Sequence, residues 1–431
     1  MPNPIAYPRA IVHFDGDSFF ASIEQSLNYT LRGKVVVTGG ERGAATSVSI
    51  EGKRLGLSRG MSLTDMKRIC PELVVVGSDY TSYSIYAKRM YAIAKQFTPL
   101  VEEYSIDECF ADITGLDVVY EMSYEQIAEG IKNRLEGDLG ITFGVGLAPN
   151  KTLAKIASKK NKPSGLAYIP RNGIEPFLKD LPVGALWGMG QSITVALQKL
   201  GVYTALEFAQ KDAYWLSEHA LSKPYRQIWL ELQGEFARTL TVTSEDTIGS
   251  ILKSFTIPPT NDKEVLLSHL AKNVEAACTK ARRHGVRARL ARFYLKNQDF
   301  HYFSYAADVP VGTNDPREFL TLIEKHFTAV YTPGMLYRTT GFSLHNLSTV
   351  ITEDLFGESA RITDRQPALT VLDAVNKKYG NNTMFLGASL TSLVREGVRS
   401  AERAKRARKR IVLGGPYRRK KLGIPYLGVA H

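Results

Sequence analysis

The stretch Ala10-Ile-Val-His-Phe-Asp15-Gly-Asp-Ser-Phe-Phe20-Ala-Ser-Ile-Glu24 decides how the fold is predicted. Residues 10–14 are mostly apolar with a bias typical of a buried strand, and the acidic residue Asp15 follows at once. Burying a carboxylate beside apolar strand sequence is costly unless a cation compensates its charge. The stretch therefore predicts a strand that carries an acidic group to a cation-binding site.

A second acidic pair, Asp107-Glu108, lies within residues 101–113, whose pattern predicts two strands. Carboxylate oxygens suit Mg²⁺, which typically takes one or two of them together with substrate phosphates. Two such ions about 3.5–4 Å apart clamp the attacking and leaving oxygens of a phosphoryl transfer. Asp15, Asp107 and Glu108 are thus predicted to hold two Mg²⁺ ions, with Mn²⁺ as a substitute. Acids exposed at strand ends are the alternative.

The pattern of the whole chain predicts several domains. Strands and helices alternate up to about residue 170, which indicates an α+β domain around one sheet. Residues 174–236 are predicted to be nearly all helical. The next part has the βαββαβ order of a split βαβ sandwich, with strands expected at 249–257, 288–296, 301–307 and 338–344 and helices at 262–284 and 316–329. Beyond it we expect a short helix at 369–379, a basic helix at 395–410 and a flexible end at 411–431.

Three motifs, in order and at fitting spacing, resemble those of the Y-family DNA polymerases. The first is the opening stretch and the second is Ser105-Ile-Asp107-Glu108. The third is Gly144-Val-Gly-Leu-Ala-Pro-Asn-Lys151-Thr-Leu-Ala-Lys155-Ile-Ala-Ser158, which ends at Lys162-Pro-Ser-Gly165. The resemblance implies a right-hand polymerase: palm (1–17 and 80–170), fingers (18–79), helix-hairpin-helix thumb (171–238), linker (239–247), βαββαβ little finger (248–348) and basic tail (349–431).

The resemblance also implies a function and residue roles. The expected activity is low-fidelity translesion DNA synthesis, in which dNTPs are transferred to a primer 3′-hydroxyl and damaged template bases are bypassed. Asp15, Asp107 and Glu108 would be catalytic metal ligands, with the Gly16 carbonyl as a further ligand. Phe20 matches the steric gate that excludes a 2′-hydroxyl by clash. A core phenylalanine is the alternative for Phe20, and Phe19 would stack near the incoming nucleotide.

The predicted fingers depart from the family pattern at two positions. Ile50 stands where the family usually has Tyr, and Lys53 where it usually has Arg. Lysine keeps the charge but loses the planar fork of arginine, so we expect weaker or altered nucleotide binding, with phosphates held by Ser47, Lys53 and Lys162. Small residues would leave the nascent base pair loosely enclosed, which weakens shape selection; these are Ala44, Thr46 and Gly60.

The predicted thumb and little finger would contact DNA through its phosphates. Gly188 and Gly190 lie in a helix-hairpin-helix pattern, which allows close approach to a phosphate; an ordinary helix turn is the alternative. Arginines cluster near the first helix-to-strand junction of the little finger, where a phosphate-binding edge is preferred over a solvated surface. The cluster consists of Arg282, Arg283, Arg287, Arg289 and Arg292.

The positive charge is concentrated at the C-terminal end. The chain has a net charge of +12, and residues 395–421 hold 12 Lys and Arg against 2 Asp and Glu. Such a region favours a polyanion such as primer–template DNA, and a solvated basic tail is the alternative. Leu355-Phe356 lies where bacterial members often carry a sliding-clamp peptide, although the Gln of that peptide is missing, and a polar loop is the alternative.

The remaining features restrict where in the cell the protein is expected and which other functions are compatible with the sequence. The three cysteines fit neither a disulfide framework nor a zinc site, and no membrane-spanning run is visible. We therefore expect a cytoplasmic, nucleoid-associated monomer, although residues 405–410 would also serve as a nuclear signal in a eukaryote. A catalytically silent DNA-damage scaffold of the same fold is one alternative, but it should have lost the carboxylates. An unrelated two-metal nuclease would leave Phe20 and Lys162 unexplained.

Overall fold

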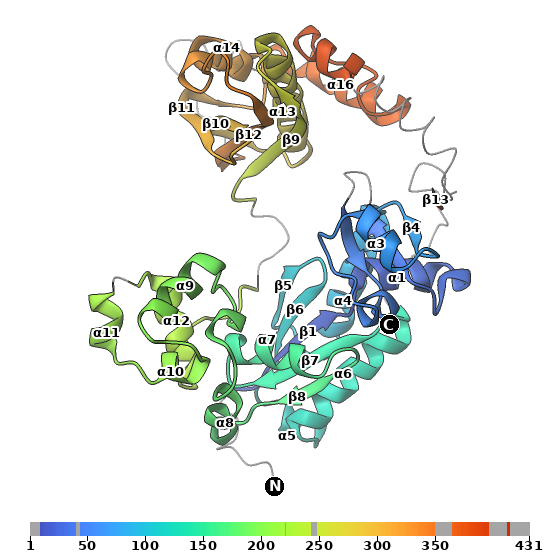
Figure 1. The fold of residues 1–431 in the computed structure, drawn as a ribbon. Helices are drawn as coiled ribbons and strands as arrows, with labels where there is room; N and C mark the ends of the chain where they lie inside the picture. The colour runs from blue at the N-terminus through green and yellow to red at the C-terminus, as the bar shows by residue number, and fades with distance from the viewer. Residues whose placement is uncertain are drawn as a thin grey trace. The chain divides into compact units, whose positions relative to one another are not determined.

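The computed structural model describes residues 9–39, 44–219, 221–242, 248–349, 364–395 and 412–413 (Figure 1). The chain divides into two compact units, one of residues 1–243 with 410–431 and one of residues 244–409. The division after residue 243 falls within the predicted linker. Cys70, Cys109 and Cys278 are buried free thiols. Among the described helices, none is both long enough and apolar enough to cross a membrane.

The first unit is built on a five-stranded sheet in the order β5-β6-β1-β7-β8. The central strand β1 (Ile11–Gly16) is buried along its whole length and pairs antiparallel with β6 (Glu108–Asp112) and β7 (Phe143–Ala148). β5 (Val101–Ser105) and β8 (Leu166–Tyr168) complete the edges. The strand predictions around both acidic motifs are confirmed.

Helices cover both faces of this sheet. Alternate residues of β1 point to opposite faces, so Val12 and Phe14 join the core under α4 (Tyr80–Lys95) and α6 (Tyr124–Leu139). Ile11 joins the core on the other face, which is shared with α7 (Lys151–Lys160) and the thumb helices. Figure 1 shows α7 between the sheet and the thumb helix α12.

The segment predicted to form the fingers contributes three strands to a small sheet in the order β13-β4-β2-β3. Its strands are β2 (Val36–Gly39), β3 (Ala45–Val48), β4 (Val74–Val76) and β13 (Val412–Leu413), and the helices are α2 (Ile50–Arg54) and α3 (Leu63–Ile69). β13 pairs in parallel with β4. The expectation of a flexible end over residues 411–431 is therefore wrong at these two positions, because a backbone partner far along the chain orders them.

The segment predicted to form the thumb is mostly helical, as expected from its sequence. It contains α8 (Ile174–Leu178), α9 (Gln191–Lys199), α10 (Ala205–Ala209), α11 (Ala213–Glu218) and α12 (Lys223–Leu232). The fully buried carboxylate of Glu231 ties α12 to α7, because it accepts hydrogen bonds from the Thr152 backbone N–H at 3.2 Å and from Arg238 Nε at 3.0 Å. Charged hydrogen bonds of this kind are among the stronger ones.

The second unit has the predicted βαββαβ order. Its strands are β9 (Ile251–Thr260), β10 (Arg287–Asn297), β11 (Tyr302–Thr313) and β12 (Tyr337–Ser348), and its helices are α13 (Lys263–Arg283) and α14 (Pro316–His326). The sheet order is β11-β10-β12-β9, with antiparallel neighbours throughout. Each helix thus joins two strands that have a third strand between them, which is the split βαβ arrangement.

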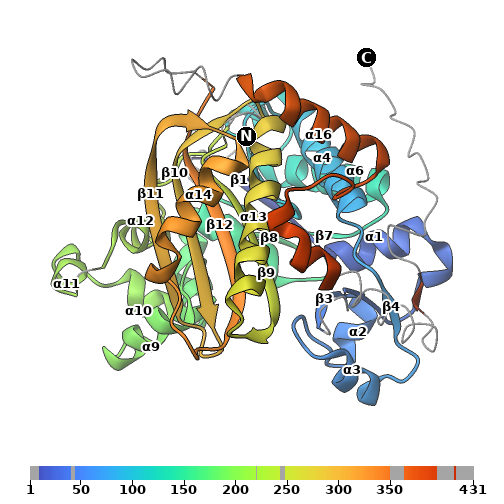
Figure 2. The same ribbon diagram turned by 90° about the horizontal axis from the view of Figure 1, so that it is seen from above.

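The segment 364–395 packs against α13 (Figures 1 and 2). It contains α16 (Gln366–Tyr379) and the 3₁₀ turn η5 (Gly387–Ser389). Asp373 of α16 pairs with Arg282 at 2.6 Å. The predicted helix at 369–379 is confirmed, whereas its packing on α13 was not predicted. Leu355 and Phe356, like most of the predicted basic helix at 395–410, lie outside the described residues.

Candidate active site

The sheet brings the predicted acidic residues together. Asp15 on β1 and Glu108 on β6 are direct cross-strand partners in the antiparallel ladder. Asp107 lies in the adjoining turn between β5 and β6, and its carbonyl accepts a hydrogen bond from the Gly16 N–H at 2.9 Å. Ser105 Oγ donates to the Asp107 carboxylate at 2.5 Å. The two sequence motifs, about 90 residues apart in the chain, therefore meet at one edge of the palm.

Lysines compensate two of these carboxylates. Lys162 Nζ lies 2.6 Å from Asp15 Oδ1 and 3.3 Å from Asp17 Oδ1. Lys155 Nζ contacts Glu108 Oε2. Burial raises the pKa of Asp15, and the Lys162 ammonium opposes that rise. Burial would also raise the pKa of Glu108, but the neighbouring His13 and Lys155 lower it to about 2, so this carboxylate is ionised.

His13 is a buried neighbour of the site for which we predicted no role. Its Nδ1 lies 2.8 Å from Ser158 Oγ, and its Nε2 faces Glu108 Oε2 at 3.7 Å. Burial lowers the pKa of His13 to about 4, so its ring is neutral. A histidine inside an otherwise apolar strand was the available sequence signal.

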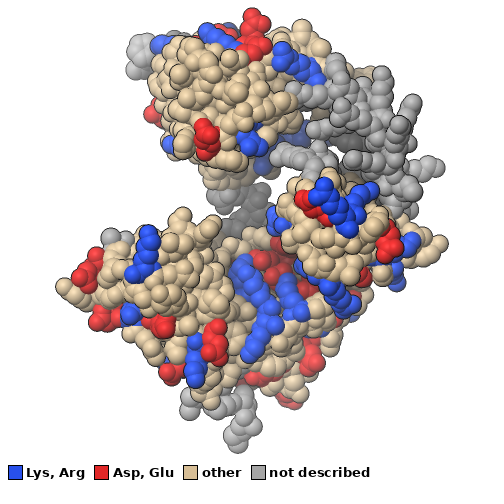
Figure 3. Space-filling view, viewed as in Figure 1, with Lys and Arg blue, Asp and Glu red and all other residues tan. Residues whose placement is uncertain are grey.

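The third motif explains how α7 reaches the site. A Cβ on Gly146 of β7 would lie 2.1 Å from the Ala154 carbonyl oxygen of α7, so only glycine allows this approach. The close packing places Lys155 against Glu108 and Lys151 Nζ at 2.6 Å from Glu102. The sequence motif contained both lysines, but no role was predicted for them. Figure 3 shows Lys and Arg side chains next to Asp and Glu side chains over this part of the palm.

The donor atoms suit a hard divalent cation. Carboxylate and backbone carbonyl oxygens are the ligands that Mg²⁺ prefers, and three carboxylates stand on neighbouring strand ends. Their side chains do not converge on one point, and no group of three His, Cys, Asp or Glu side chains within the described ranges is close enough to hold an ion. The site thus fits Mg²⁺ in the chemistry of its donors, with Lys155 and Lys162 in contact with two of them.

The two aromatic residues of the first motif have different environments. Phe20 is half-buried at the start of α1 (Phe19–Leu27), and its ring stacks on that of Tyr83 with centroids 4.4 Å apart. One side of Phe20 is thus supported while part of it stays accessible. Phe19 is only 3% exposed and belongs to the palm core. The prediction that Phe19 stacks near the nucleotide is therefore wrong, because its ring has no free face.

The predicted phosphate ligands lie beside the acidic site. Ser47 Oγ donates to the Ser18 carbonyl at 3.2 Å, which places it at the start of α1. Lys53 is an exposed residue of α2. Its pKa is lowered mainly by partial burial and, to a smaller extent, by the charge of Lys162. Asp17 and Asp15 act on Lys53 in the opposite direction. Lys53 therefore lies close enough to Lys162, Asp15 and Asp17 to feel their charges.

The thumb glycines form a turn before a helix. Gly188 has a φ of 91°, which favours glycine, and Gly190 precedes α9 without a side-chain cap. The turn is anchored by Trp187, whose ring stacks on Phe110 of β6 with centroids 5.8 Å apart. Uncapped N–H groups at such a turn are available to an acceptor.

The little-finger arginines do not act as one group. Arg283 and Arg289 are exposed, and Arg287 is half-buried. Arg282 is different, because its guanidinium donates to both Asp373 oxygens, at 2.6 and 2.8 Å, and to the Asn314 carbonyl at 2.9 Å. The prediction that Arg282 contacts DNA is wrong in this arrangement, since these bonds already occupy its guanidinium.

Comparison with known proteins gives consistent matches. Residues 14–159 match the impB/mucB/samB family, and residues 249–355 match its C-terminal domain. A DNA polymerase IV of Desulfatibacillum aliphaticivorans is 30% identical over 90% of this chain and 99% of its own. DNA polymerase IV 1 of Bacillus subtilis is 28% identical over 89% of this chain and 93% of its own.

Solved structures share the fold. A chimeric Y-family DNA polymerase aligns with a TM-score of 0.67 at 22% identity, covering 80% of this chain and 100% of its own. An insertion ternary complex of Dbh DNA polymerase aligns with a TM-score of 0.55 at 23% identity over the same shares. At these identities the structural matches establish the common architecture.

Proposed function

The chain belongs to the Y-family of DNA polymerases, and from this premise we propose how its residues carry out synthesis. It is a DNA-directed DNA polymerase of the translesion class, which binds DNA and dNTPs. The observation that carries the proposal is the cross-strand pair of Asp15 and Glu108, with Asp107 in the adjoining turn. A silent scaffold would not need all three carboxylates, and no feature of the chain favours that alternative.

Asp15, Asp107 and Glu108, with the Gly16 carbonyl, would hold two Mg²⁺ ions, or Mn²⁺ in their place. Enzymes of this family depend on divalent metal ions. When bound, such ions activate the primer 3′-hydroxyl and neutralise charge on the triphosphate. Glu108 is ionised because His13 and Lys155 stabilise its charge, so it is ready to accept a cation. The neutral ring of His13 adds no positive charge that would compete.

Ser47, Lys53 and Lys162 would hold the triphosphate. The charge of Lys162 lowers the pKa of Lys53, and a polyanion beside the two lysines would relieve that repulsion. Lys162 also contacts Asp15 and Asp17, which fixes its ammonium beside the metal-binding carboxylates. Ile50 offers no hydrogen bond at its position, so we expect weaker nucleotide binding than in relatives that have Tyr there.

Phe20 would act as the steric gate. Stacking on Tyr83 holds its ring in place, so a 2′-hydroxyl on the nucleotide sugar would clash and could not displace it. Small residues at 44, 46 and 60 would leave the new base pair loosely enclosed, which is how damaged template bases are accommodated.

The remaining contacts would hold the duplex and the replication machinery. Arg283, Arg287 and Arg289 would contact phosphates in the little finger, and the Gly188–Gly190 turn would do so in the thumb. Leu355-Phe356 is proposed as an anchor for a sliding clamp. The relatives are bacterial, which supports a cytoplasmic enzyme that works at the nucleoid. We propose that it acts as a monomer.

Primer extension tests the proposal directly. Wild type and Asp107→Ala/Glu108→Ala would be given Mg²⁺, dNTPs and an abasic template. We expect wild type to extend past the lesion and the double variant to bind DNA without extension. Well-folded wild type that binds DNA and does not extend undamaged primer would overturn the proposal. In that case Ile50 and Lys53 would be the first residues to restore to Tyr and Arg.

A further inference from the structure

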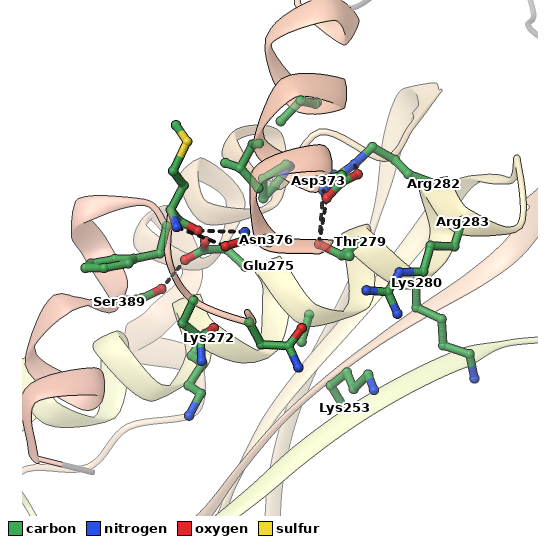
Figure 4. A pocket seen from close by; sticks show the side chains of 18 of the residues that line it. Lys253, Lys272, Glu275, Thr279, Lys280, Arg282, Arg283, Asp373, Asn376 and Ser389 are labelled. Carbon is green, nitrogen blue, oxygen red and sulfur yellow. Dashed lines mark hydrogen bonds and ion pairs between the residues drawn. The ribbon is translucent and has the colours of Figure 1, made fainter. Parts of the chain in front are cut away.

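A groove on the helical side of the second unit has, apart from Arg283, no residue in the roles above. It has a volume of about 450 Å³ and lies between β9 and α13 on one side and the segment 364–395 on the other (Figure 4). The groove is well defined because Asp373 pairs with Arg282, and Glu275 of α13 accepts a hydrogen bond from the Leu386 N–H at 3.0 Å. Both acids in the groove wall are thus engaged within the chain.

Three cations of this groove lack such partners among the described residues. Lys253 of β9 and Lys280 and Arg283 of α13 make no side-chain hydrogen bond or ion pair with the residues that the structure describes. Burial lowers the pKa of Lys253, and the charges of Lys280 and Arg283 lower it further. Figure 4 shows the three side chains on the same side of the groove. An anion bound from outside would relieve the repulsion between these neighbouring cations.

Uncharged lining residues add a second kind of contact. Phe385 is half-buried and lines the groove, together with the amides of Asn381 and Asn382. A basic groove with an aromatic side chain on which a base can stack is typical of sites that bind single-stranded nucleic acid, and the amides add hydrogen-bond donors. A pure phosphate site would not need the aromatic ring, and an acidic peptide would not need a stacking surface.

The groove faces away from the open side of the sheet. Along β9, Ile251 and Phe255 lie under α13, and Phe255 stacks on His269 of that helix. Lys253 has the same alternation and therefore points to the helical side, whereas Leu252 and Ser254 are exposed on the other. A ligand in the groove thus leaves the open face of the sheet free for duplex.

We propose that this groove binds single-stranded DNA through its phosphates and bases, as a site separate from the polymerase centre. A cleft of about 450 Å³ admits part of one strand and not a duplex. The inference rests on the proposed function, because a translesion polymerase works at junctions that expose unpaired template. A strand held here would keep the enzyme at the junction without occupying the metal site.

The test measures affinity for oligothymidylate by fluorescence anisotropy over a range of salt concentrations. The full chain carrying Lys253→Gln/Lys280→Gln is compared with Lys325→Gln/Lys377→Gln, which removes two exposed cations of the same unit outside the groove. We expect the groove variant to lose affinity on the order of tenfold near 0.1 M salt, and its log K against log salt slope to fall by about 1.4, because each phosphate contact contributes about 0.7. The control should keep both values.

Phe385→Ala separates stacking from charge. We expect about tenfold weaker binding with an unchanged salt slope, since base stacking contributes without releasing counterions. Thermal melting would show whether either variant is unfolded.

Three results would overturn the inference. The first is an equal response of the groove and control variants, and the second is unchanged binding by a folded Phe385→Ala variant. In the third, the groove variant weakens binding of polyglutamate but not of oligothymidylate. That result would mean that the groove binds an acidic protein. Extension of a primer with a one-nucleotide overhang is measured in parallel. Wild type that fails there refutes the proposed function, whereas normal extension with no groove effect refutes only the groove.

Discussion

The palm site and the groove on α13 both gather lysines, but they compensate those charges in opposite ways. In the palm, Lys155 meets Glu108, Lys162 meets Asp15, and Lys151 meets Glu102 at 2.6 Å. In the groove, Lys253, Lys280 and Arg283 have no acidic partner among the described residues. Removing one member of a buried pair leaves the other uncompensated, whereas removing one of several repelling cations does not. We therefore expect the charges of the palm to affect stability and the charges of the groove to affect ligand binding.

The largest expected effect is on catalysis in the palm. Asp15→Asn should lower single-nucleotide incorporation more than about 100-fold, because a proposed metal ligand is lost. The fold should survive, since Lys162 keeps Asp17 as a partner at 3.3 Å. The measurement is incorporation rate with Mg²⁺, alongside the melting temperature. Glu129→Gln, an exposed acid on α6, is the control and should retain full activity. Substantial residual activity in Asp15→Asn would remove this carboxylate from the metal site.

The next effect is on stability at the palm–thumb contact. Glu231→Ala should lower the free energy of unfolding by about 3–5 kcal/mol, because Arg238 and the Thr152 N–H lose a fully buried charged partner. Glu235→Ala, three residues beyond the end of α12, should change it by less than about 0.5 kcal/mol, since that side chain is 61% exposed and its ion pair with Arg171 is 3.8 Å long. The free energies of unfolding are measured by chemical denaturation. Equal losses in the two variants would contradict the distinction between buried, compensated charges and solvated ones.

The palm was predictable from sequence because its signals are local. A strand that ends in Asp15 and a second strand pair around Asp107 each carry their own evidence, and β-sheet pairing then brings them together. The same reasoning failed for Phe19, because an aromatic pair at the start of a helix does not reveal which ring faces the core. Lys155 and His13 were missed because their roles depend on the close approach of α7 to the sheet.

In the second unit, long-range contacts limited what the sequence could predict. Its βαββαβ order followed from hydrophobic periodicity, but the packing of segment 364–395 on α13 did not. Arg282 shows why: within its arginine-rich cluster nothing distinguishes it from Arg283, yet only Arg282 is matched by Asp373, about 90 residues later. The groove is formed by that long-range contact. A charge cluster in the sequence therefore cannot be assigned to a ligand until its intramolecular partners are known.

A smaller effect is expected at Lys53. Its charge is only partly compensated by neighbouring acids, so it lies between the paired lysines of the palm and the unpaired lysines of the groove. Asp17 and Asp15 favour its protonated form, while burial and Lys162 disfavour it. Lys53→Arg should lower the KM for dNTP about three- to tenfold with little change in kcat, because a guanidinium offers a planar fork to phosphate and stays charged. Arg54→Lys, the reverse change on the next residue, should leave KM unaltered. Steady-state kinetics with all four dNTPs would show whether Lys53 reaches the triphosphate at all.

The smallest effect distinguishes the two regions most directly. Lys253→Met should leave the free energy of unfolding unchanged or raise it by about 0.5 kcal/mol, because it removes a repelled cation and keeps the aliphatic packing. Lys151→Met, the same change at a compensated lysine, should instead destabilise the protein, since the buried Glu102 loses its partner. Because the folded pKa of Lys253 lies below 10.5, its charge costs stability at all pH values below that folded pKa.

That cost disappears as the pH rises through the folded pKa of Lys253 towards 10.5, where the unfolded chain also loses the proton. The gain from Lys253→Met should therefore be full near neutral pH and should vanish above pH 10.5. Melting temperatures of both variants at pH 7 and at the highest pH that the wild type tolerates test this sign. A loss of stability on Lys253→Met at pH 7 would mean that this lysine has an intramolecular partner, and the groove would then have the same compensated charges as the palm.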